Sequence, residues 1–84
     1  MIYLIAPRIK LAESASFFLK LPRSSWRFVI EEHHIQSIQL HAGDLFIWVN
    51  APSYSKTRQD YERQDYIAAF IKDRQIHALE YTLP

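Results

Sequence analysis

Two short runs of consecutive apolar residues, at positions 2–6 and 45–49, constrain the fold of this chain more than any other feature. Each run is short and contains β-branched or aromatic residues, which favours a strand over a helix. A strand with one face in water alternates apolar and polar side chains, whereas a strand covered on both faces is apolar throughout. We therefore expect both runs to be strands of a sheet that has helices on both faces.

A helix is expected between the first apolar run and Pro22. Apolar residues recur at helical spacing over residues 9–20, and the polar residues between them, including Ser16, should face away from the core. Pro22 should end this helix, because the residue before a proline avoids the helical region. The expected buried stripe consists of Leu11, Ala15, Phe18 and Leu19, with Ala12 beside them.

A second long helix is predicted from about residue 58 to Arg74. Thr57 and Asp60 have the spacing of a capping box, in which a hydroxyl and an acid three residues later cap the first turn. Its apolar stripe is formed by Ile67, Phe70 and Ile71. The short apolar segments at residues 26–30 and 76–81 are predicted to be two further strands.

The predicted elements alternate between strands and helices, and residues 31–44 are expected to hold a short helix or an irregular crossover, with Ile35 and Ile38 at helical spacing. Two architectures share this order. One is an α/β domain with a four-stranded, mostly parallel sheet of order 2-1-3-4, and the other is a ferredoxin-like α+β domain. The two apolar runs and the long connection favour the parallel sheet. The alternative would pair residues 35–40 with the strand at 45–49 through a turn at residues 42–44.

Composition excludes several classes of protein. The 84 residues are expected to form one domain, residues 1–84, and they include no cysteine, which excludes a disulfide framework, a zinc ribbon and a thiol nucleophile. The formal charge of +1 lacks the basic excess that is typical of nucleic-acid binders. No secretion signal or membrane-spanning run is visible in the sequence. We therefore expect a cytoplasmic protein that does not associate with membranes.

The favoured fold also predicts where a ligand or partner would bind. In an open parallel sheet this place lies outside the carboxyl ends of the strands, here between the first and third strands. Cations, hydroxyl groups and a helix N-terminus meet there, which would suit an anionic group, although the loops lack the glycines of phosphate-binding loops. The candidate ligand- or partner-binding residues are Arg8, Lys10, Asn50, Ser53, Tyr54, Ser55, Lys56, Arg58 and Tyr61.

We expect no enzymatic activity, no metal and no cofactor. The histidines His33, His34 and His41 do not have the spacing of zinc ligands. Ser24 and Ser25 follow a proline at a turn, and the sequence contains no nucleophile elbow. No residue in the chain is therefore predicted to be catalytic.

Tyrosines and arginines indicate an interaction surface. Aromatic residues make up 14% of the chain, more than a small core can hide. Tyr54, Tyr61 and Tyr66 lie beside Arg58 and Arg63, and tyrosine with arginine is the typical composition of interface hot spots. We expect a small non-enzymatic protein-interaction module that docks on a protein partner or on itself. It would be of the adaptor or inhibitor type that phages and mobile elements often encode.

Two alternative functions stay open from the sequence. A phosphate- or nucleotide-binding α/β domain would use the anionic-ligand site at the strand ends. A nucleic-acid-binding protein would stack bases on Tyr54 and Tyr61. Its basic rim would consist of Arg8, Lys10, Lys56, Arg58 and Arg63.

Overall fold

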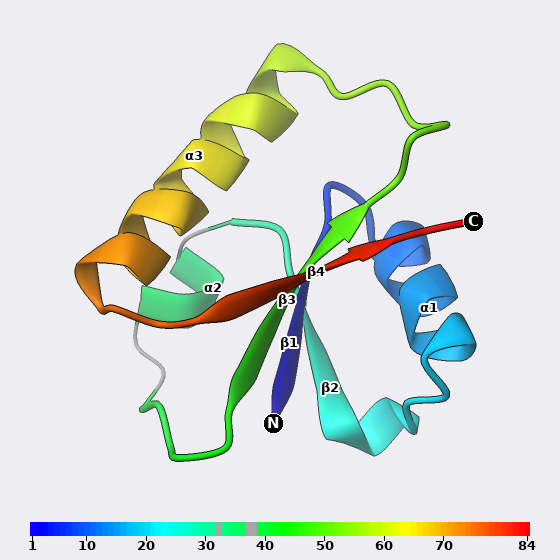
Figure 1. Ribbon diagram of the computed structural model, residues 1–84. Helices are drawn as coiled ribbons and strands as arrows, with labels where there is room; N and C mark the ends of the chain where they lie inside the picture. The colour runs from blue at the N-terminus through cyan, green and yellow to red at the C-terminus, as the bar shows by residue number, and fades with distance from the viewer. Residues whose placement is uncertain (32, 37–38) are drawn as a thin grey trace.

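The computed structural model describes residues 1–31, 33–36 and 39–84 and contains a four-stranded sheet in which every strand pairing is parallel (Figure 1). The strands lie in the order β2-β1-β3-β4. The predicted α/β sheet of order 2-1-3-4 is therefore confirmed, and the ferredoxin-like alternative is wrong. The strands are β1 (Ile2–Ile5), β2 (Trp26–Val29), β3 (Leu45–Asn50) and β4 (Ala78–Thr82).

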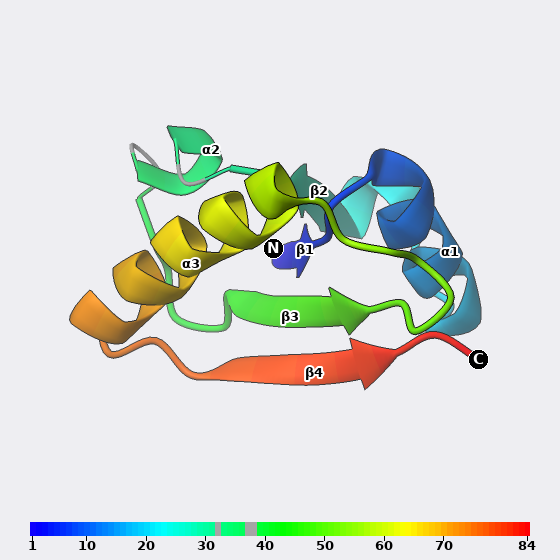
Figure 2. The ribbon, with the colours of Figure 1, turned by 90° about the horizontal axis from the view of Figure 1, so that it is seen from above.

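Helices lie on both faces of this sheet (Figures 1 and 2). On one face lies α1 (Ile9–Phe18), and on the other lie α2 (His33–Gln36) and α3 (Arg58–Asp73); a 3-10 turn (Arg23–Ser25) precedes β2. The expected short helix between β2 and β3 is α2, whereas Ile38 lies outside the described residues. None of the described helices has the length and apolar character needed to cross a membrane.

The core has two layers because β1 and β3 send side chains to both faces of the sheet. Tyr3 and Phe46 face α2 and α3, and their rings stack with centroids 4.7 Å apart. Leu4 and Ile47 face α1 instead. The α2–α3 layer contains Tyr3, Ile5, Val29, Ile35, Phe46, Ile67, Phe70 and Ile71. The α1 layer contains Leu4, Ala6, Ala12, Ala15, Trp26, Ile47 and Val49.

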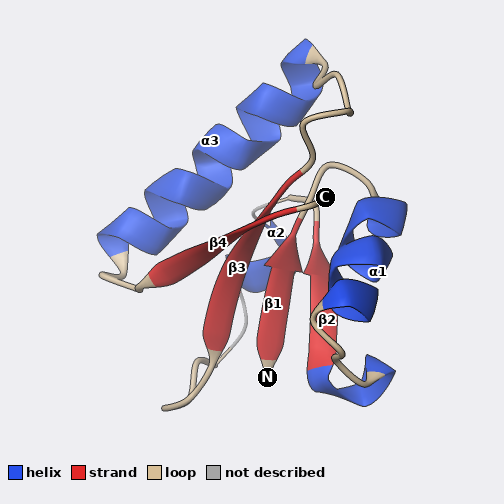
Figure 3. Ribbon diagram, turned by 45° about the vertical axis from the view of Figure 1, so that its right-hand side comes forward, coloured by secondary structure: helices blue, strands red, loops and turns tan. Residues whose placement is uncertain are grey.

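The two faces of the sheet are covered unequally. Two helices cover one face, whereas α1 is the single helix of the described chain on the other. Figure 3 shows α1 beside β2, with β4 at the opposite edge of the sheet. Because α1 also contacts β3, β4 is the strand that no described helix covers on this side. Leu79 of β4 pairs in register with Ile47, so it faces the α1 side, where it is 44% exposed.

Both long helices end in a Schellman motif that uses a residue other than glycine. After α1, the Lys20 N–H donates to the Phe17 carbonyl (3.2 Å) and the Leu21 N–H donates to the Ser16 carbonyl (2.9 Å). Lys20 has a φ of 57°, in the left-handed region. The helix therefore ends at Phe18, ahead of Pro22, and the prediction that Pro22 ends it is wrong.

The end of α3 repeats this arrangement. Gln75 has a φ of 54°, and its N–H donates to the Lys72 carbonyl (3.0 Å), while the Ile76 N–H donates to the Ile71 carbonyl (3.0 Å). A left-handed conformation costs a non-glycine residue roughly 1–2 kcal/mol. Each helix end thus carries backbone strain that glycine would remove.

The buried side of α1 differs in part from the predicted stripe. Ala12 and Ala15 are buried as expected. Ser16, predicted to face away, is 8% exposed, and its hydroxyl donates to the Glu13 carbonyl (2.7 Å). Phe18, predicted to be buried, is 50% exposed. Since the small residues Ala12, Ala15 and Ser16 face the sheet, α1 packs close to it and its phenylalanines remain outside.

Glycine at the two left-handed positions should stabilise the protein. We expect Lys20→Gly and Gln75→Gly each to raise the free energy of unfolding by about 0.5–1 kcal/mol, because glycine adopts positive φ at little cost. Urea unfolding followed by tryptophan fluorescence measures the change. Ala68→Gly, at an exposed position inside α3, is the control and should lower stability by about 1 kcal/mol. Destabilisation by all three substitutions would contradict the assignment of strain to the two helix ends.

Candidate functional site

The buried carboxylate of Asp60 organises the carboxyl edge of the sheet, where the loops after β1 and β3 meet. Arg8 caps the start of α1, and its Nη1 donates to Asp60 Oδ1 at 3.0 Å. Tyr54, in the loop after β3, donates its hydroxyl to Asp60 Oδ2 at 2.9 Å. The Thr57 N–H donates to the same oxygen at 2.9 Å, and the Asp60 N–H donates to Thr57 Oγ1 at 3.2 Å. One side chain therefore connects α1, the β3–α3 loop and the first turn of α3.

The hydrogen bonds hold Asp60 in its ionised form. Its side chain is only 1% exposed, and burial alone would raise its pKa. The hydrogen bonds from the Thr57 backbone, the Tyr54 hydroxyl and Arg8 outweigh burial and lower the pKa of Asp60 to about 2. Burial and the hydrogen bond to Asp60 together raise the pKa of Tyr54. At neutral pH the pair consists of an ionised carboxylate and a neutral phenol.

The predicted binding residues thus meet only in part. The structure brings Arg8 to Tyr54, with the guanidinium 5.5 Å from the ring centroid, and Lys56 to Tyr61, with the ammonium 5.4 Å from the ring centroid. Arg58 instead turns to Glu62, with its Nε 3.2 Å from Oε1. Among the described residues no side-chain hydrogen bond or ion pair joins the remaining candidates to this cluster. These are Lys10, Asn50, Ser53 and Ser55.

The cations at this edge are largely neutralised by carboxylates of the same chain. Arg8 pairs with Asp60, Arg58 with Glu62, and Arg63 Nη2 lies 3.5 Å from Glu31 Oε1. An anionic ligand would have to compete with these carboxylates. Arg8, Arg58 and Arg63 are thus not free for an anion, whereas the anionic-ligand site at the strand ends stays a prediction.

The sequence predicts Asp60 only as part of a helix cap. The capping box is confirmed, with both of its hydrogen bonds present. Of the additional partners, Tyr54 lies six residues before Asp60 in the β3–α3 loop, whereas Arg8 lies 52 residues away in sequence. The signal that could have identified them is the parallel topology itself, because it places the residues after β1 next to those that begin α3.

No metal centre is present in the described part of the chain, where no three His, Cys, Asp or Glu side chains gather closely enough to hold an ion. The His34 Nδ1 accepts a hydrogen bond from the Ile30 N–H (3.3 Å), and the His41 N–H donates to Asp44 Oδ2 (2.8 Å). The side chain of His33 lies outside the described part. The His34 side chain and the His41 backbone thus have local, structural partners.

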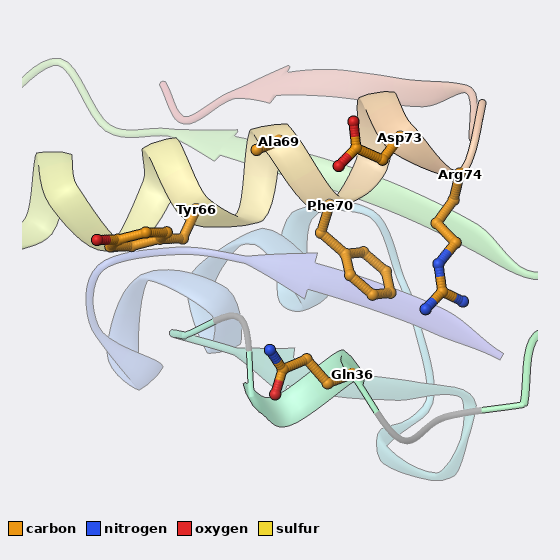
Figure 4. Close-up of a pocket in the computed structure, with 6 residues that line it drawn as sticks. All are labelled: Gln36, Tyr66, Ala69, Phe70, Asp73 and Arg74. Atoms are coloured by element: carbon orange, nitrogen blue, oxygen red, sulfur yellow. The ribbon is translucent and has the colours of Figure 1, made fainter.

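A pocket of about 330 Å³ lies between α2 and α3 (Figure 4). Gln36 faces Tyr66, Phe70 and Arg74 across it, and the Arg74 guanidinium lies 4.6 Å from the centroid of the Phe70 ring. Every polar side chain that lines this pocket is exposed. It therefore lacks the fixed polar groups that orient a small ligand.

The most apolar exposed surface lies on the opposite side of the sheet. Phe17 is 76% exposed, and its ring meets the half-exposed ring of Phe18 edge to face, with centroids 5.5 Å apart. On β4, which no described helix covers on this side, Leu79 is 44% exposed. Tyr81 and Leu83 pack partly buried on the same layer. We define the α1–β4 face as Phe17, Phe18, Leu79, Tyr81 and Leu83; Ile47, which pairs with Leu79, is buried in the α1 layer.

The sequence does not indicate the α1–β4 face. Its helical spacing predicts that Phe18 is in the core, and the predicted interaction surface is the rim at Tyr54, Arg58 and Tyr61. In the structure Tyr61 is indeed 57% exposed, but Tyr54 is partly buried and bound to Asp60. The rim and the α1–β4 face are therefore distinct surfaces.

Comparison of the chain with protein-family models, with curated proteins and with solved structures finds no match in any of the three. Function is consequently inferred from the residues and their arrangement.

Stability should depend on pH through Asp60. Because the folded-state pKa is depressed from 3.8 to about 2, its contribution is full above about pH 5 and is lost as pH falls to about 2. It amounts to roughly 2 kcal/mol. We expect Asp60→Asn to lower the free energy of unfolding at pH 7 by a similar amount and to flatten its pH dependence in this window. Urea titrations at several pH values measure both effects.

The exposed Asp65 in the same helix provides the matched control for this experiment. Asp65→Asn should leave both the stability and its pH dependence nearly unchanged. A wild-type pH dependence that survives intact in Asp60→Asn would show that other carboxylates cause it.

Proposed function

We propose that this chain is a small non-enzymatic protein-interaction module that docks through the α1–β4 face. The observation that supports this proposal is the exposure of Phe17 and Phe18 on α1, together with that of Leu79 on β4. Phenylalanine buries about 150–250 Å² when it enters a core or an interface, so these two side chains leave roughly 200 Å² of aromatic surface in water. The two rings contact each other edge to face, so they form one exposed aromatic patch, and such patches are often binding sites for protein.

Electrostatics favour a protein partner over a nucleic acid. Binding to phosphates needs unpaired Lys or Arg side chains along one surface, whereas Arg8, Arg58 and Arg63 each pair with a carboxylate. The side chains that define the α1–β4 face are uncharged, although the exposed Glu13 and Lys20 lie four residues before and three residues after Phe17. Docking through Phe17 and Leu79 themselves removes no charge from water.

The proposal includes an adaptor or inhibitor role and a cytoplasmic location. An adaptor or inhibitor works by occupying the surface of another protein, which requires an exposed docking face and no reactive group. A chain without cysteine is suited to a reducing compartment.

Selection of binding peptides from a displayed random library tests the proposal. The sequences that the protein enriches report which side chains its surface binds. The immobilised protein should enrich peptides that contain aromatic and aliphatic anchors, since these complement a neutral apolar face. Their binding should weaken at least tenfold with Phe17→Ser or Leu79→Thr. Isothermal titration with the enriched peptides measures the change.

Tyr61→Ser is the matched control, because Tyr61 is a similarly exposed aromatic residue on α3, at the rim predicted from the sequence. It should leave peptide binding unchanged. The proposal is overturned if no peptide is enriched, or if the enriched peptides bind the Phe17→Ser and Leu79→Thr variants as tightly as the original chain.

A further inference from the structure

We propose that the partner adds an extended segment to the free edge of β4, as a fifth strand of the sheet, and that this segment alternates apolar and basic residues. The inference rests on the proposed function, since it names the conformation and the chemistry of the protein that docks on Leu79 and Tyr81. It adds backbone hydrogen bonds at the strand edge to the side-chain contacts of the α1–β4 face.

The hydrogen bond that follows β4 shows which of its backbone groups point to β3. β4 is the last strand in the order β2-β1-β3-β4, and Figure 2 shows it at the rim of the sheet. The Leu83 N–H donates to the Asn50 carbonyl of β3 at 2.8 Å. In a parallel ladder the N–H and C=O of every second residue point to the same neighbour. The backbone groups of Tyr81 and Leu79 therefore also point to β3.

The residues between these positions point their N–H and C=O groups to the other side, where no strand lies. They are Ala78, Glu80 and Thr82, and in the part of the chain that the structure describes no other segment or side chain bonds to these groups. No residue of β4 is buried, so its edge is accessible. An edge with this row of unpaired donors and acceptors is a template for one further strand.

The opposite edge of the sheet differs, because side chains of the same chain occupy part of it. On β2 the Trp26 carbonyl accepts a hydrogen bond from Arg23 Nη1 (2.9 Å), and the Ile30 N–H that follows the strand donates to His34 Nδ1 (3.3 Å). Both groups point away from β1, whereas the Val29 carbonyl between them points to it. A strand that added to β2 would have to displace these bonds, and one that adds to β4 would not.

The side chains of β4 predict the sequence pattern of the added strand. Leu79 and Tyr81 pair in register with residues of the α1 layer and face that side of the sheet. Glu80 pairs with Trp48, which packs on the α2–α3 layer, and faces the other side. Since side chains opposite one another on neighbouring strands interact, the added strand should place apolar residues beside Leu79 and Tyr81. The residue beside Glu80 lies on the other face of the added strand.

Glu80 favours a basic residue at that position. Its side chain is exposed, and it forms no ion pair with any described residue. Opposite charges on neighbouring strands stabilise the pairing, and like charges directly opposite destabilise it. A segment that alternates apolar residues with lysine or arginine therefore fits both faces of β4.

The same carboxylate disfavours a second copy of this chain as the added strand. An antiparallel pair that aligns the whole of β4 with itself places Glu80 opposite Glu80 at the two-fold axis, on one face of the sheet. A register that separates the two carboxylates leaves part of this five-residue strand unpaired. A basic segment of another protein avoids both costs.

Two synthetic peptides of equal length test the side-chain pattern, one alternating valine with lysine and the other alternating valine with glutamate. Isothermal titration should show that the valine–lysine peptide binds roughly tenfold more tightly, because one opposite-charge pair replaces a like-charge pair. Glu80→Lys should reverse this preference. Asp65→Lys, at an exposed position on α3, changes the net charge equally and should keep it. A valine–lysine peptide that does not bind, or a preference that Glu80→Lys leaves intact, overturns the proposal.

Hydrogen exchange measured by NMR tests the backbone contact. In the free chain the amides of Glu80 and Thr82 should exchange rapidly, and the bound valine–lysine peptide should slow them. The amides of Tyr81 and Leu83, which donate to β3, should be slow in both states.

A proline at the edge gives an independent test. Thr82→Pro removes an N–H that points to the free edge, which an edge strand tolerates, and it should abolish peptide binding. Thr82→Ala keeps this N–H and should bind normally. Circular dichroism and urea unfolding establish that both variants are folded. Normal binding by a folded Thr82→Pro variant contradicts strand addition.

Strand addition and the proposed function fail in different ways. If selected peptides lose affinity with Phe17→Ser or Leu79→Thr while the amides of Glu80 and Thr82 stay unprotected, the proposed function stands and strand addition is overturned. If no peptide binds, both are overturned. A doubled mass in sedimentation equilibrium, with these amides protected in the absence of peptide, would show that a second copy occupies the edge and would overturn the basic partner.

Discussion

The structure depends on the burial of β1 and β3 on both of their faces. A strand in the middle of a parallel sheet presents apolar side chains to both faces of the sheet. Each face must therefore be covered by helices, which the crossover connections between the strands supply. Here the connections after β2 and β3 provide two helices on one side, and the connection after β1 provides a single helix on the other. The asymmetry of the molecule, including its exposed phenylalanines, follows from this distribution.

The Asp60 cluster shows how a site-like arrangement can serve the fold. A buried, ionised carboxylate with a depressed pKa, beside a tyrosine and an arginine, has the composition of many reactive centres. Its two oxygens already accept hydrogen bonds from Arg8, Tyr54 and Thr57. Such a carboxylate can accept few further hydrogen bonds from a substrate. Its hydrogen bonds hold the start of α3 next to the start of α1.

The parallel sheet and both long helices could be predicted from the sequence, because periodicity and continuous apolar runs report burial directly. The end of α1 could not, since Lys20 adopts a left-handed conformation that is usual for glycine. The candidate residues at the strand ends lie at the predicted edge, but their pairing with Asp60 and Glu62 depends on side-chain directions that topology alone does not give. The exposure of Phe18 escapes prediction for a different reason. Apolar spacing marks a helix face, and it does not say whether another element is there to cover it.

The central position of β1 also bears on how the chain acquires its structure. One neighbour of β1 is β2, which follows after a local crossover. The other neighbour, β3, begins roughly forty residues after β1, and closing such a long loop is slow. A partly folded chain that has formed only β1, α1 and β2 therefore has one unpaired inner edge, with Tyr3 and Ile5 uncovered toward the missing α3. During synthesis this intermediate persists until β3 is available. The step at which the protein is most prone to aggregate would thus precede the pairing of β3 with β1.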